Sequence, residues 1–330
     1  MRVVVTGATG NLGTSVLGAL AEEPEVESIV GIARRRPAVT LPKVEWVAAD
    51  ITHVDPVPLF AKADAVVHLV WIVQPNHDEA ELQRVNVVGS LRVFQAAAVA
   101  GVPTLVVESA FGAYSRGPKD RLVDETWPTH GIPRSWYSRQ KAYLERALDA
   151  FALAHPEVRL VRFRSALALK REAAAQAHRL YGGPLLPRSL ARPGKVPGVP
   201  TIARLRTQAV HSLDVGQAYR QALVRDVRGA FNLAADPVLD PETMAAVLRT
   251  RTKFLPAWLL RAGVAATWRL RLQPTSPDWV DLLLEPPLLD ASRARQELDW
   301  TPTRTATEAL VEFMDGVADG AGGATPPLLP

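Results

Sequence analysis

A turn with three glycines, placed between a strand and a helix, constrains this chain more than any other feature. The apolar run Arg2–Thr6 leads directly into Gly-Ala-Thr-Gly-Asn-Leu-Gly at residues 7–13, and a helical pattern begins inside that motif. The first glycine permits a tight turn, the second lets the backbone approach a pyrophosphate, and the third lets the helix pack closely on the strand. Free N–H groups at the helix N-terminus then bind the phosphates. The motif predicts a dinucleotide-binding turn made of Gly7, Thr9, Gly10, Asn11, Leu12 and Gly13.

Short apolar segments alternate with helical patterns over the first 165 residues. The expected strands are Arg2–Thr6, Ser28–Ala33, Val44–Ala48, Ala65–Leu69, Thr104–Glu108 and Arg159–Arg162. The expected helices between them are Asn11–Ala21, Glu79–Ala100 and Tyr137–His155. Continuous apolar strands that alternate with helices imply a parallel sheet covered on both faces. We therefore predict a doubly wound, Rossmann-type α/β fold, in which ligands bind at the carboxyl ends of the strands.

The regular alternation stops after Arg164. Residues 182–200 contain five prolines and four glycines and read as loops. A helix at Asp214–Arg225 and a strand at Ala230–Ala234 then return to the first pattern, and the rest is helical with proline breaks. We predict a dinucleotide-binding domain of residues 1–164 and 205–235, and a smaller, mostly helical substrate-binding region of residues 165–204 and 236–315. Residues 316–330 are expected to be a flexible tail.

The composition excludes several classes of protein. The chain is 48% hydrophobic and 22% charged, as in ordinary soluble domains, and no apolar run reaches the roughly 18 residues that a membrane span needs. It has no cysteine, and its few histidines lack metal-ligand spacing, so no metal site is expected. The net charge of +4 comes from scattered arginines, without a nucleic-acid-binding motif. We expect a cytoplasmic enzyme for a small molecule, with neither nucleic acid nor membrane as a partner.

The residues after the second strand bear on which dinucleotide is bound. An acidic residue about 20 positions past the glycines holds a ribose 2′-hydroxyl, whereas arginine accommodates a 2′-phosphate. Here that position is Ala33, and Arg34, Arg35 and Arg36 follow it. The pattern favours NADP(H) over NAD(H), although NAD(H) and a simple solvated basic turn stay open. Asp50, after the third strand, is either an adenine ligand or an ordinary loop aspartate.

Tyr137 and Lys141 begin a predicted helix four residues apart, so their side chains share one helix face. A lysine beside a tyrosine favours the phenolate and lowers the tyrosine pKa. The hydroxyl can then exchange a proton with an alcohol or ketone while a hydride moves at the adjacent carbon. The spacing alone is weak, but its position after the fifth strand and behind a dinucleotide turn gives it weight.

With these motifs the sequence resembles the extended short-chain dehydrogenases/reductases, in the NAD(P)-dependent epimerase/dehydratase branch, over nearly the whole chain. Besides the glycine turn and the Tyr-Lys pair, the matching pieces are Ala49–Ile51, Val67–Leu69, Asn86–Gly89, Val210–Val215, Phe231–Leu233, Leu289–Ala294 and Leu298–Pro302. The resemblance implies the fold and the cofactor class, but it is poorly specific for the substrate.

The resemblance also implies roles for individual residues. Tyr137 would be the acid/base, Lys141 would bind the nicotinamide ribose, and Asn86 would support the lysine through structured water. Leu69 and Val70 would line the cofactor side of the cleft, with Asp50 and Ile51 near the adenine. The family's active-site serine lies four residues before a tyrosine that follows the fifth strand.

That serine is where this chain departs from the family. Counting back from Tyr114 reaches Ala110, so either Ser109 takes over or the hydroxyl is missing. Loss of one such donor typically costs about 10²–10³ in rate. Glu108 is a second oddity, read either as a strand-end carboxylate in an ion pair or as a catalytic part. Where relatives carry an Arg-Pro-Gly-like turn after the sixth strand, this chain has Arg164-Ser165-Ala166.

The residues that the resemblance places around the cleft are mostly large and apolar, which suits a hydrophobic small molecule. The candidate substrate contacts are Trp71, Gln74, Phe111, Tyr114, Leu167 and His178. The leading hypothesis is an NADP(H)-dependent oxidoreductase or epimerase for a secondary alcohol or ketone. A non-redox lyase, isomerase or cyclase and a non-catalytic NADP sensor are the alternatives. The resemblance also implies a homodimer through the helices Glu79–Ala100 and Tyr137–His155.

Overall fold

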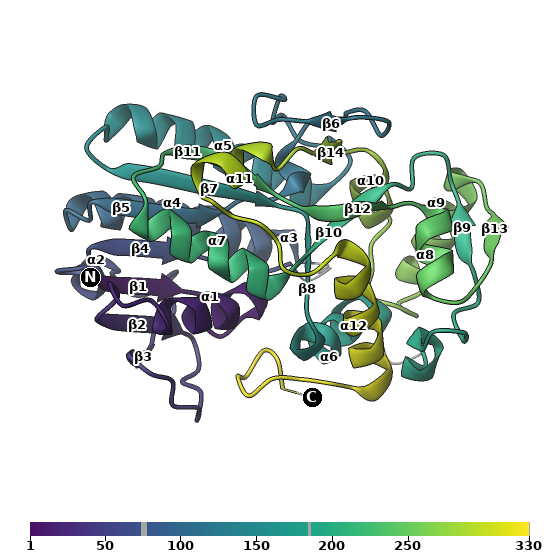
Figure 1. The fold of residues 1–330 in the computed structure, drawn as a ribbon, viewed down its shortest axis with the longest axis horizontal. Coiled ribbons are helices and arrows are strands. Elements are labelled where there is room, and N and C mark those ends of the chain that lie inside the picture. Colours follow the sequence, from purple (N-terminus) through teal and green to yellow (C-terminus); the bar gives the residue numbers. More distant parts are fainter. Residues whose placement is uncertain (74–77, 184–185, 330) are drawn as a thin grey trace.

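The fold is organised around a parallel sheet of seven strands, which are spread from top to bottom in the left half of Figure 1. A computed structural model describes residues 1–73, 78–183 and 186–329. The strand order is β11-β7-β5-β4-β1-β2-β3, and every neighbouring pair is parallel. The strands are β1 (Arg2–Thr6), β2 (Ser28–Ala33), β3 (Val44–Ala48), β4 (Ala65–His68), β5 (Thr104–Glu108), β7 (Arg159–Ser165) and β11 (Gly229–Leu233). The predicted Rossmann-type fold is confirmed.

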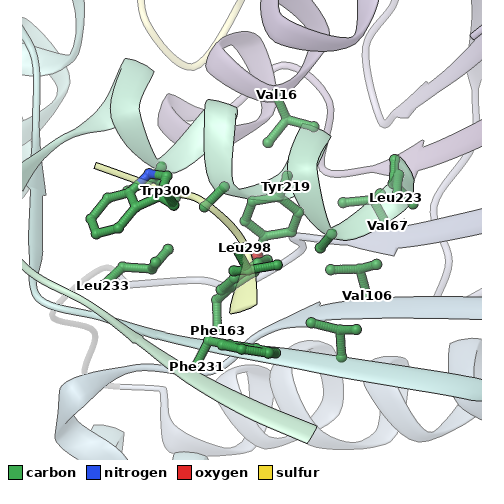
Figure 2. Packing of buried hydrophobic residues seen from close by; sticks show 14 of the residues in the cluster. Val16, Val67, Val106, Phe163, Tyr219, Leu223, Phe231, Leu233, Leu298 and Trp300 are labelled. Atoms are coloured by element: carbon green, nitrogen blue, oxygen red, sulfur yellow. The ribbon is translucent and has the colours of Figure 1, made fainter. Parts of the chain in front are cut away.

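Helices cover both faces of this sheet because its strands alternate apolar side chains between two cores. Val3 and Val5 point into a core under α1 (Asn11–Ala21) and α7 (Ser212–Val224), shown in Figure 2. Val4 points into the opposite core, under α2 (Val57–Phe60), α4 (Gly89–Val99) and α5 (Trp136–Ala154). Each strand is therefore buried on both sides, as its continuous apolar sequence predicts.

The helix expected at Glu79–Ala100 is continuous but changes its winding. It begins as α3 (Glu79–Leu82), passes through a π-helical stretch at Gln83–Val88 and continues as α4. A π-helical turn redirects side chains relative to a regular helix and is frequent at functional sites. Asn86 lies inside this stretch and is fully buried.

A second lobe, at the right of Figure 1, is built from smaller sheets and short helices. Its sheets are β12-β10-β8, made of Ala235–Leu239, Thr207–His211 and Leu167–Leu169, and the pair β9 (Val199–Thr201) and β13 (Thr252–Phe254). Its helices are α6 (Ala174–Ala177), α8 (Pro241–Val247), α9 (Ala257–Arg269), α10 (Asp278–Leu284) and α12 (Ala306–Asp319). The strands β6 (Leu122–Val123) and β14 (Leu288–Leu289) pair beside the larger sheet, where α11 (Ser292–Glu297) also packs.

Two segments lie in the other lobe from the one that the expected domain boundaries assign them to. Strand β10, within residues 205–235, pairs with β8 and β12 in the second lobe rather than with the large sheet. Conversely, Ala294, Leu298 and Trp300 pack in the core beneath α7, although the sequence groups them with the substrate-binding region. The chain therefore crosses between the lobes again after residue 284.

The segment after residue 316 also differs from the expected flexible tail. Helix α12 continues to Asp319, and the following residues fold back over the second lobe toward the glycine turn. Thr325 and Leu328 are buried, and the Thr325 hydroxyl donates a hydrogen bond to the carbonyl of Thr9 at 2.7 Å. The tail thus contributes to the surroundings of the predicted dinucleotide site.

Candidate active site

The glycine turn between β1 and α1 is closely packed at Gly7 and Gly13 and open at Gly10. Gly7 has a φ of +74°, and a Cβ there would lie 2.8 Å from the carbonyl carbon of Leu69. A Cβ on Gly13 would lie 2.2 Å from the oxygen of Gly7, so the helix can approach the strand only without a side chain. A Cβ on Gly10 would meet no atom closer than 3.4 Å, which leaves open space on its outer side. That space is where a pyrophosphate approaches the backbone.

The start of α1 presents unsatisfied hydrogen-bonding groups at this turn. Gly10 is the N-cap and offers no side-chain cap, and the first turn carries no acidic residue. The Asn11 amide donates to the Ala168 carbonyl at 2.9 Å, while its Oδ1 is buried without a partner. Free N–H groups at a helix start form a favourable site for phosphate. The residues present therefore fit a dinucleotide.

A lysine that sequence reasoning missed lies behind the turn. The ammonium of Lys170 is buried and donates to the Asn11 carbonyl, to Thr14 Oγ1 and to Ser15 Oγ, at 2.9, 2.6 and 3.0 Å. Burial lowers the pKa of Lys170 to about 8. Its charge adds to the positive end of the helix dipole beside the phosphate site.

The end of β2 carries the three arginines. Arg34, Arg35 and Arg36 are exposed, and none forms an ion pair within the described ranges. Arg35 lines a surface depression together with Arg179 and the tail residues 326, 327 and 329. Two guanidinium groups therefore border one depression beside the turn.

The predicted adenine-side residues lie at the end of β3. Asp50 is half-buried and accepts from the backbone N–H and the hydroxyl of Thr52, at 2.9 and 2.7 Å. Partial burial raises the pKa of Asp50, but the two Thr52 bonds outweigh it and hold the pKa below its usual value. Ile51 is buried in the core under α4.

A short segment after β4 connects the glycine turn with the Tyr-Lys pair. The Leu69 backbone N–H donates to the Thr6 carbonyl at 3.1 Å, and Leu69 and Val70 are the backbone neighbours of Gly7. The next residue, Trp71, packs edge-on against Tyr137 with 6.0 Å between ring centroids. The segment Leu69–Trp71 thus contacts the glycine turn at one end and Tyr137 at the other.

Lys141 is buried and held at two points. Its Nζ donates to the carbonyl of Glu108 at 2.9 Å and lies 3.6 Å from the centroid of the Trp71 ring. Burial lowers its pKa to about 7, although the carboxylates of Glu108 and Glu145 act in the opposite direction. A cation over an indole face is stabilised electrostatically, and more strongly when water is excluded.

Tyr137 is enclosed by aromatic rings. Its ring centroid lies 6.0 Å from that of Trp136 and 5.5 Å from that of Trp279, which in turn packs edge-on against Tyr181 at 5.0 Å. Burial and the Glu108 carboxylate raise the pKa of Tyr137 above its usual value. This direction is opposite to the one expected from the lysine alone, because the surrounding rings exclude water.

The aromatic enclosure leaves several polar atoms unsatisfied. The indole N–H groups of Trp71, Trp136 and Trp279 are buried and have no hydrogen-bond partner in the described structure. An unsatisfied buried donor costs roughly 1–3 kcal/mol. Such donors around one tyrosine suit a ligand that brings its own acceptor.

Glu108 is neither exposed nor in an ion pair with an arginine in the described structure. Its Oε2 accepts from the hydroxyl of Tyr219 on α7 at 2.7 Å. Burial raises the pKa of Glu108 to about 7, and the Tyr219 bond only partly opposes this. The carboxyl therefore changes its charge near neutral pH, close to Lys141.

Asn86 organises the loop after β4 rather than bonding directly to Lys141. Its Oδ1 accepts from the Ile72 backbone N–H at 2.7 Å, and its amide donates to the Ile72 carbonyl and to Gln140. A hydrogen-bonded chain also runs from Thr6 through His68 to Ser90, whose hydroxyl donates to the Asn86 carbonyl.

Ser109 and Ala110 occupy the serine region of the family. Ser109 is buried, and its hydroxyl donates to Glu145 Oε1 on α5 at 2.6 Å. Glu145 also accepts from Arg164 and Arg162, at 2.8 and 2.9 Å, and these interactions lower its pKa to about 2 despite its burial. Ser109 thus belongs to a buried ionic network, while Ala110 packs with Tyr137.

The remaining predicted substrate contacts are scattered. Phe111 packs beside Tyr137, whereas Tyr114 is fully buried and donates to Asn232 at 2.7 Å. Leu167 packs in the core of the second lobe, and His178 bonds the carbonyl of Leu186. Gln74 lies outside the described residues. The histidine, aspartate and glutamate side chains of the described ranges form no cluster that could hold a metal ion.

The site residues that the sequence did not indicate come from distant parts of the chain. Trp279 packs on Tyr137 and Tyr181 packs on Trp279, whereas Tyr219 bonds Glu108. Trp279 comes from α10 and Tyr181 from the π-helical turn His178–Gly182. Tyr219 comes from α7. A sequence scan can note such aromatics, but no local spacing connects them with a catalytic pair.

Comparison with known proteins agrees with this geometry. Residues 3–169 match the model of the NAD dependent epimerase/dehydratase family. An uncharacterized protein of Mycobacterium tuberculosis is 24% identical over 335 residues, which cover 95% of this chain and 83% of that protein. The sterol-4-alpha-carboxylate 3-dehydrogenase, decarboxylating, of Saccharomyces cerevisiae is 28% identical over 192 residues, or 57% of this chain and 48% of the yeast protein.

Among solved structures, the UDP-glucose 4-epimerase of Thermus thermophilus in complex with NAD superposes with a TM-score of 0.69. The match covers 96% of this chain and 99% of the epimerase, at 22% identity. The glycine turn, the sheet order, the Tyr-Lys pair and the family match agree: this chain belongs to the NAD dependent epimerase/dehydratase family.

Proposed function

We propose that this protein is an NADP(H)-dependent oxidoreductase or epimerase that acts on a secondary alcohol or ketone of a hydrophobic small molecule. The observation that carries the proposal is the enclosure of Tyr137 by Trp71, Trp136 and Trp279 beside the buried Lys141. Aromatic side chains around a reactive group favour an apolar ligand, which the few polar groups beside them then orient.

Tyr137 is the proton donor in this proposal. The phenol carries its proton at neutral pH and passes it to the substrate carbonyl oxygen as the adjacent carbon is reduced. A bound nicotinamide would supply the hydride that reduces the adjacent carbon, or accept it in the reverse direction. In this proposal Lys141, whose Nζ contacts the Glu108 carbonyl and the Trp71 ring, is the residue that binds the cofactor ribose.

The missing serine hydroxyl leaves the substrate carbonyl in need of another donor. Ala110 has no polar side chain, and the Ser109 hydroxyl is engaged by Glu145. The rings of Trp71, Trp136 and Trp279 pack on Tyr137, and their indole N–H groups are unpaired donors in the described structure. We infer that at least one of them bonds the substrate oxygen.

The preference for NADP(H) rests on the end of β2. No acid is available at Ala33 to hold a ribose 2′-hydroxyl, and the exposed Arg34 and Arg35 follow it. Arg35 borders the depression, where the Arg179 guanidinium already donates to the carbonyls of Pro327 and Leu329. The Thermus thermophilus structure was solved with NAD, so the two dinucleotides must be compared directly.

The apolar substrate is likewise a proposal. The yeast relative is named for a sterol carboxylate, whereas the Thermus thermophilus relative is named for UDP-glucose. The tryptophans around Tyr137 favour the first kind of ligand. A non-redox lyase, isomerase or cyclase is the second candidate, because Ala110 replaces the family serine.

A homodimer through α4 and α5 is also part of the proposal. Val99 on α4, and Tyr143 and Leu153 on α5, are exposed apolar side chains on the two helices that the family resemblance assigns to the interface.

The test is a substrate panel assayed with both cofactors. Apolar secondary alcohols and ketones, including sterol-like compounds, are compared with UDP-sugars while the absorbance of reduced nicotinamide is followed. Turnover of apolar ketones with NADPH supports the proposal, whereas turnover of UDP-sugars alone contradicts it. Consumption of a substrate without any net absorbance change favours the non-redox candidate or an epimerase, which product analysis distinguishes.

A further inference from the structure

Helix α9 and its flanks, residues 249–272, expose an unusual number of large apolar side chains. Phe254 is 84% exposed, and Trp258 and Leu270 are each 70% exposed. Leu259 and Leu272 are exposed as well. No residue of α9 is fully buried. We refer to residues 249–272 as the α9 surface.

The exposed positions of α9 follow its helical period. Residues 258, 259, 262, 263, 266 and 270 are exposed and lie on one face of the helix. The opposite face packs through Leu260 and Val264 against Ile202, Val280 and Leu284. A helix that is apolar on both faces belongs in an apolar environment rather than half in water.

The charge of the α9 surface is also one-sided. From residue 243 to residue 277 the chain has six lysines and arginines and not one aspartate or glutamate. Arg261 pairs with Asp281 of α10. The exposed cations without an ion pair in the described chain are Arg249, Arg251, Lys253, Arg269 and Arg271. They flank the apolar face at both ends of the helix.

We propose that the α9 surface docks this protein peripherally on an anionic phospholipid bilayer. Apolar and aromatic side chains on one helix face, with basic residues beside them, are the combination that binds the interface of an anionic membrane. Helix α9 has 13 residues, too few to span a bilayer, so in this proposal it lies along the membrane surface. Trp258 then lies at the level of the headgroups, where tryptophan is favoured.

Other occupants fit less well. A second copy would bring five further cations against the same surface, and like charges oppose that contact. A nucleic acid would match the charge and could stack on Trp258, but the other exposed positions of the helix face are leucine, alanine and glycine, which offer bases neither rings nor hydrogen bonds. The anionic bilayer satisfies both the charge and the apolar face.

The α9 surface lies close to Tyr137. Helix α9 lies at the right edge of Figure 1, in the second lobe, and packs on α10. Trp279 and Leu282 of α10 cover Tyr137. A single short helix therefore separates the docking surface from the proposed apolar pocket. The docking itself does not depend on the proposed function.

The test is co-flotation of the full chain with lipid vesicles. The wild-type protein should bind phosphatidylcholine vesicles that contain phosphatidylglycerol, and high salt should weaken the binding. Phe254→Ser with Trp258→Ser, and separately Arg269→Glu with Arg271→Glu, should each lower the partition coefficient more than about tenfold. The control Leu122→Ser with Arg134→Glu changes an exposed leucine and an exposed arginine elsewhere and should bind like the wild type.

Three results would overturn the proposal. One is equal binding of the wild type and both patch variants to the anionic vesicles. Another is absence of wild-type binding to the anionic vesicles, and a gel shift of single-stranded DNA that the arginine variant abolishes would then identify nucleic acid as the occupant. The third is a dimer in light scattering that the Phe254 and Trp258 variant converts to a monomer. Circular dichroism and cofactor titration on each variant establish that fold and cofactor site are intact.

Discussion

The Nζ of Lys141 lies 3.6 Å from the centroid of the Trp71 ring, and only two residues separate Trp71 from His68 at the end of β4. The indole thus connects α5, which carries Tyr137 and Lys141, with the end of β4 beside the glycine turn. Because Lys141 is buried, the ring and the Glu108 carbonyl are its main stabilising contacts.

Replacing Trp71 by leucine should lower the pKa of Lys141. The cation–π contact in a desolvated site is worth about 1–2 kcal/mol, which corresponds to roughly one pKa unit. The pKa is measured from the pH dependence of lysine acylation, with peptide mapping at Lys141. Trp127→Leu is a control tryptophan away from this lysine. An unchanged Lys141 pKa would show that the ring does not stabilise the charge.

Ser109→Ala should reduce stability far more than catalysis. The variant removes a buried hydrogen bond to the Glu145 carboxylate, a loss of about 1.5–3 kcal/mol in the free energy of unfolding. The value of kcat should stay within a few-fold of wild type, because the hydroxyl is engaged on the α5 side. Denaturant unfolding and steady-state kinetics separate the two effects. A drop of about 10²-fold in kcat with unchanged stability would assign the serine's usual role to Ser109 after all.

Glu108→Gln should stabilise the protein at alkaline pH. The pKa of this carboxyl is raised from 4.5 to about 7, so the protonated form is the favoured one in the folded state. The contribution of the protonated Glu108 carboxyl to the free energy of unfolding is fully present below pH 4.5 and is lost as the pH rises through 7. The glutamine variant, which stays neutral, should therefore gain about 2 kcal/mol relative to wild type between about pH 5 and 8.

Thermal unfolding across that pH range checks the effect, and Glu45→Gln, at an exposed carboxylate of β3, serves as the control. A stability difference that does not vary with pH would mean that the Glu108 carboxyl is already ionised in the folded protein.

Arg34→Ala with Arg35→Ala should weaken NADPH binding selectively. Loss of charge-assisted contacts to a 2′-phosphate should raise the Kd for NADPH about tenfold or more, with little change for NADH. Fluorescence titration measures both constants, and Arg134→Ala provides an exposed control arginine. Tighter binding of NADH than NADPH by the wild type would contradict the cofactor preference.

The strands of the large sheet could be predicted closely from the sequence because each is a buried, continuous apolar run. The boundaries of β1, β2, β3 and β5 agree with the expectation, and β7 extends three residues further, to Ser165. The glycine turn was equally readable, since Gly7 and Gly13 lack space for a side chain. These features depend on local chemistry.

The functional surroundings depend on long-range contacts and could not be read in the same way. Glu108 and Ser109 are adjacent in sequence, yet their side chains point to opposite faces of the sheet, toward Tyr219 and Glu145. Neither partner is specified by spacing along the chain. Trp279 packs directly on Tyr137, although 142 positions separate the two residues in the sequence and no motif connects them.

The exposed basic and apolar residues of the α9 surface could not be predicted from the sequence either. In the sequence its cations look scattered among apolar residues, as arginines do throughout this chain. Only the packing of Leu260 and Val264 shows which face of the helix is turned outward.

The most direct measurement compares wild type and Tyr137→Phe for turnover of an apolar ketone from the panel and for affinity toward NADPH. We predict that the variant loses at least about 10³-fold in kcat, because the proton donor is gone, while the Kd for NADPH changes less than about threefold. Retention of wild-type turnover by Tyr137→Phe would contradict the assignment of Tyr137 as the acid/base.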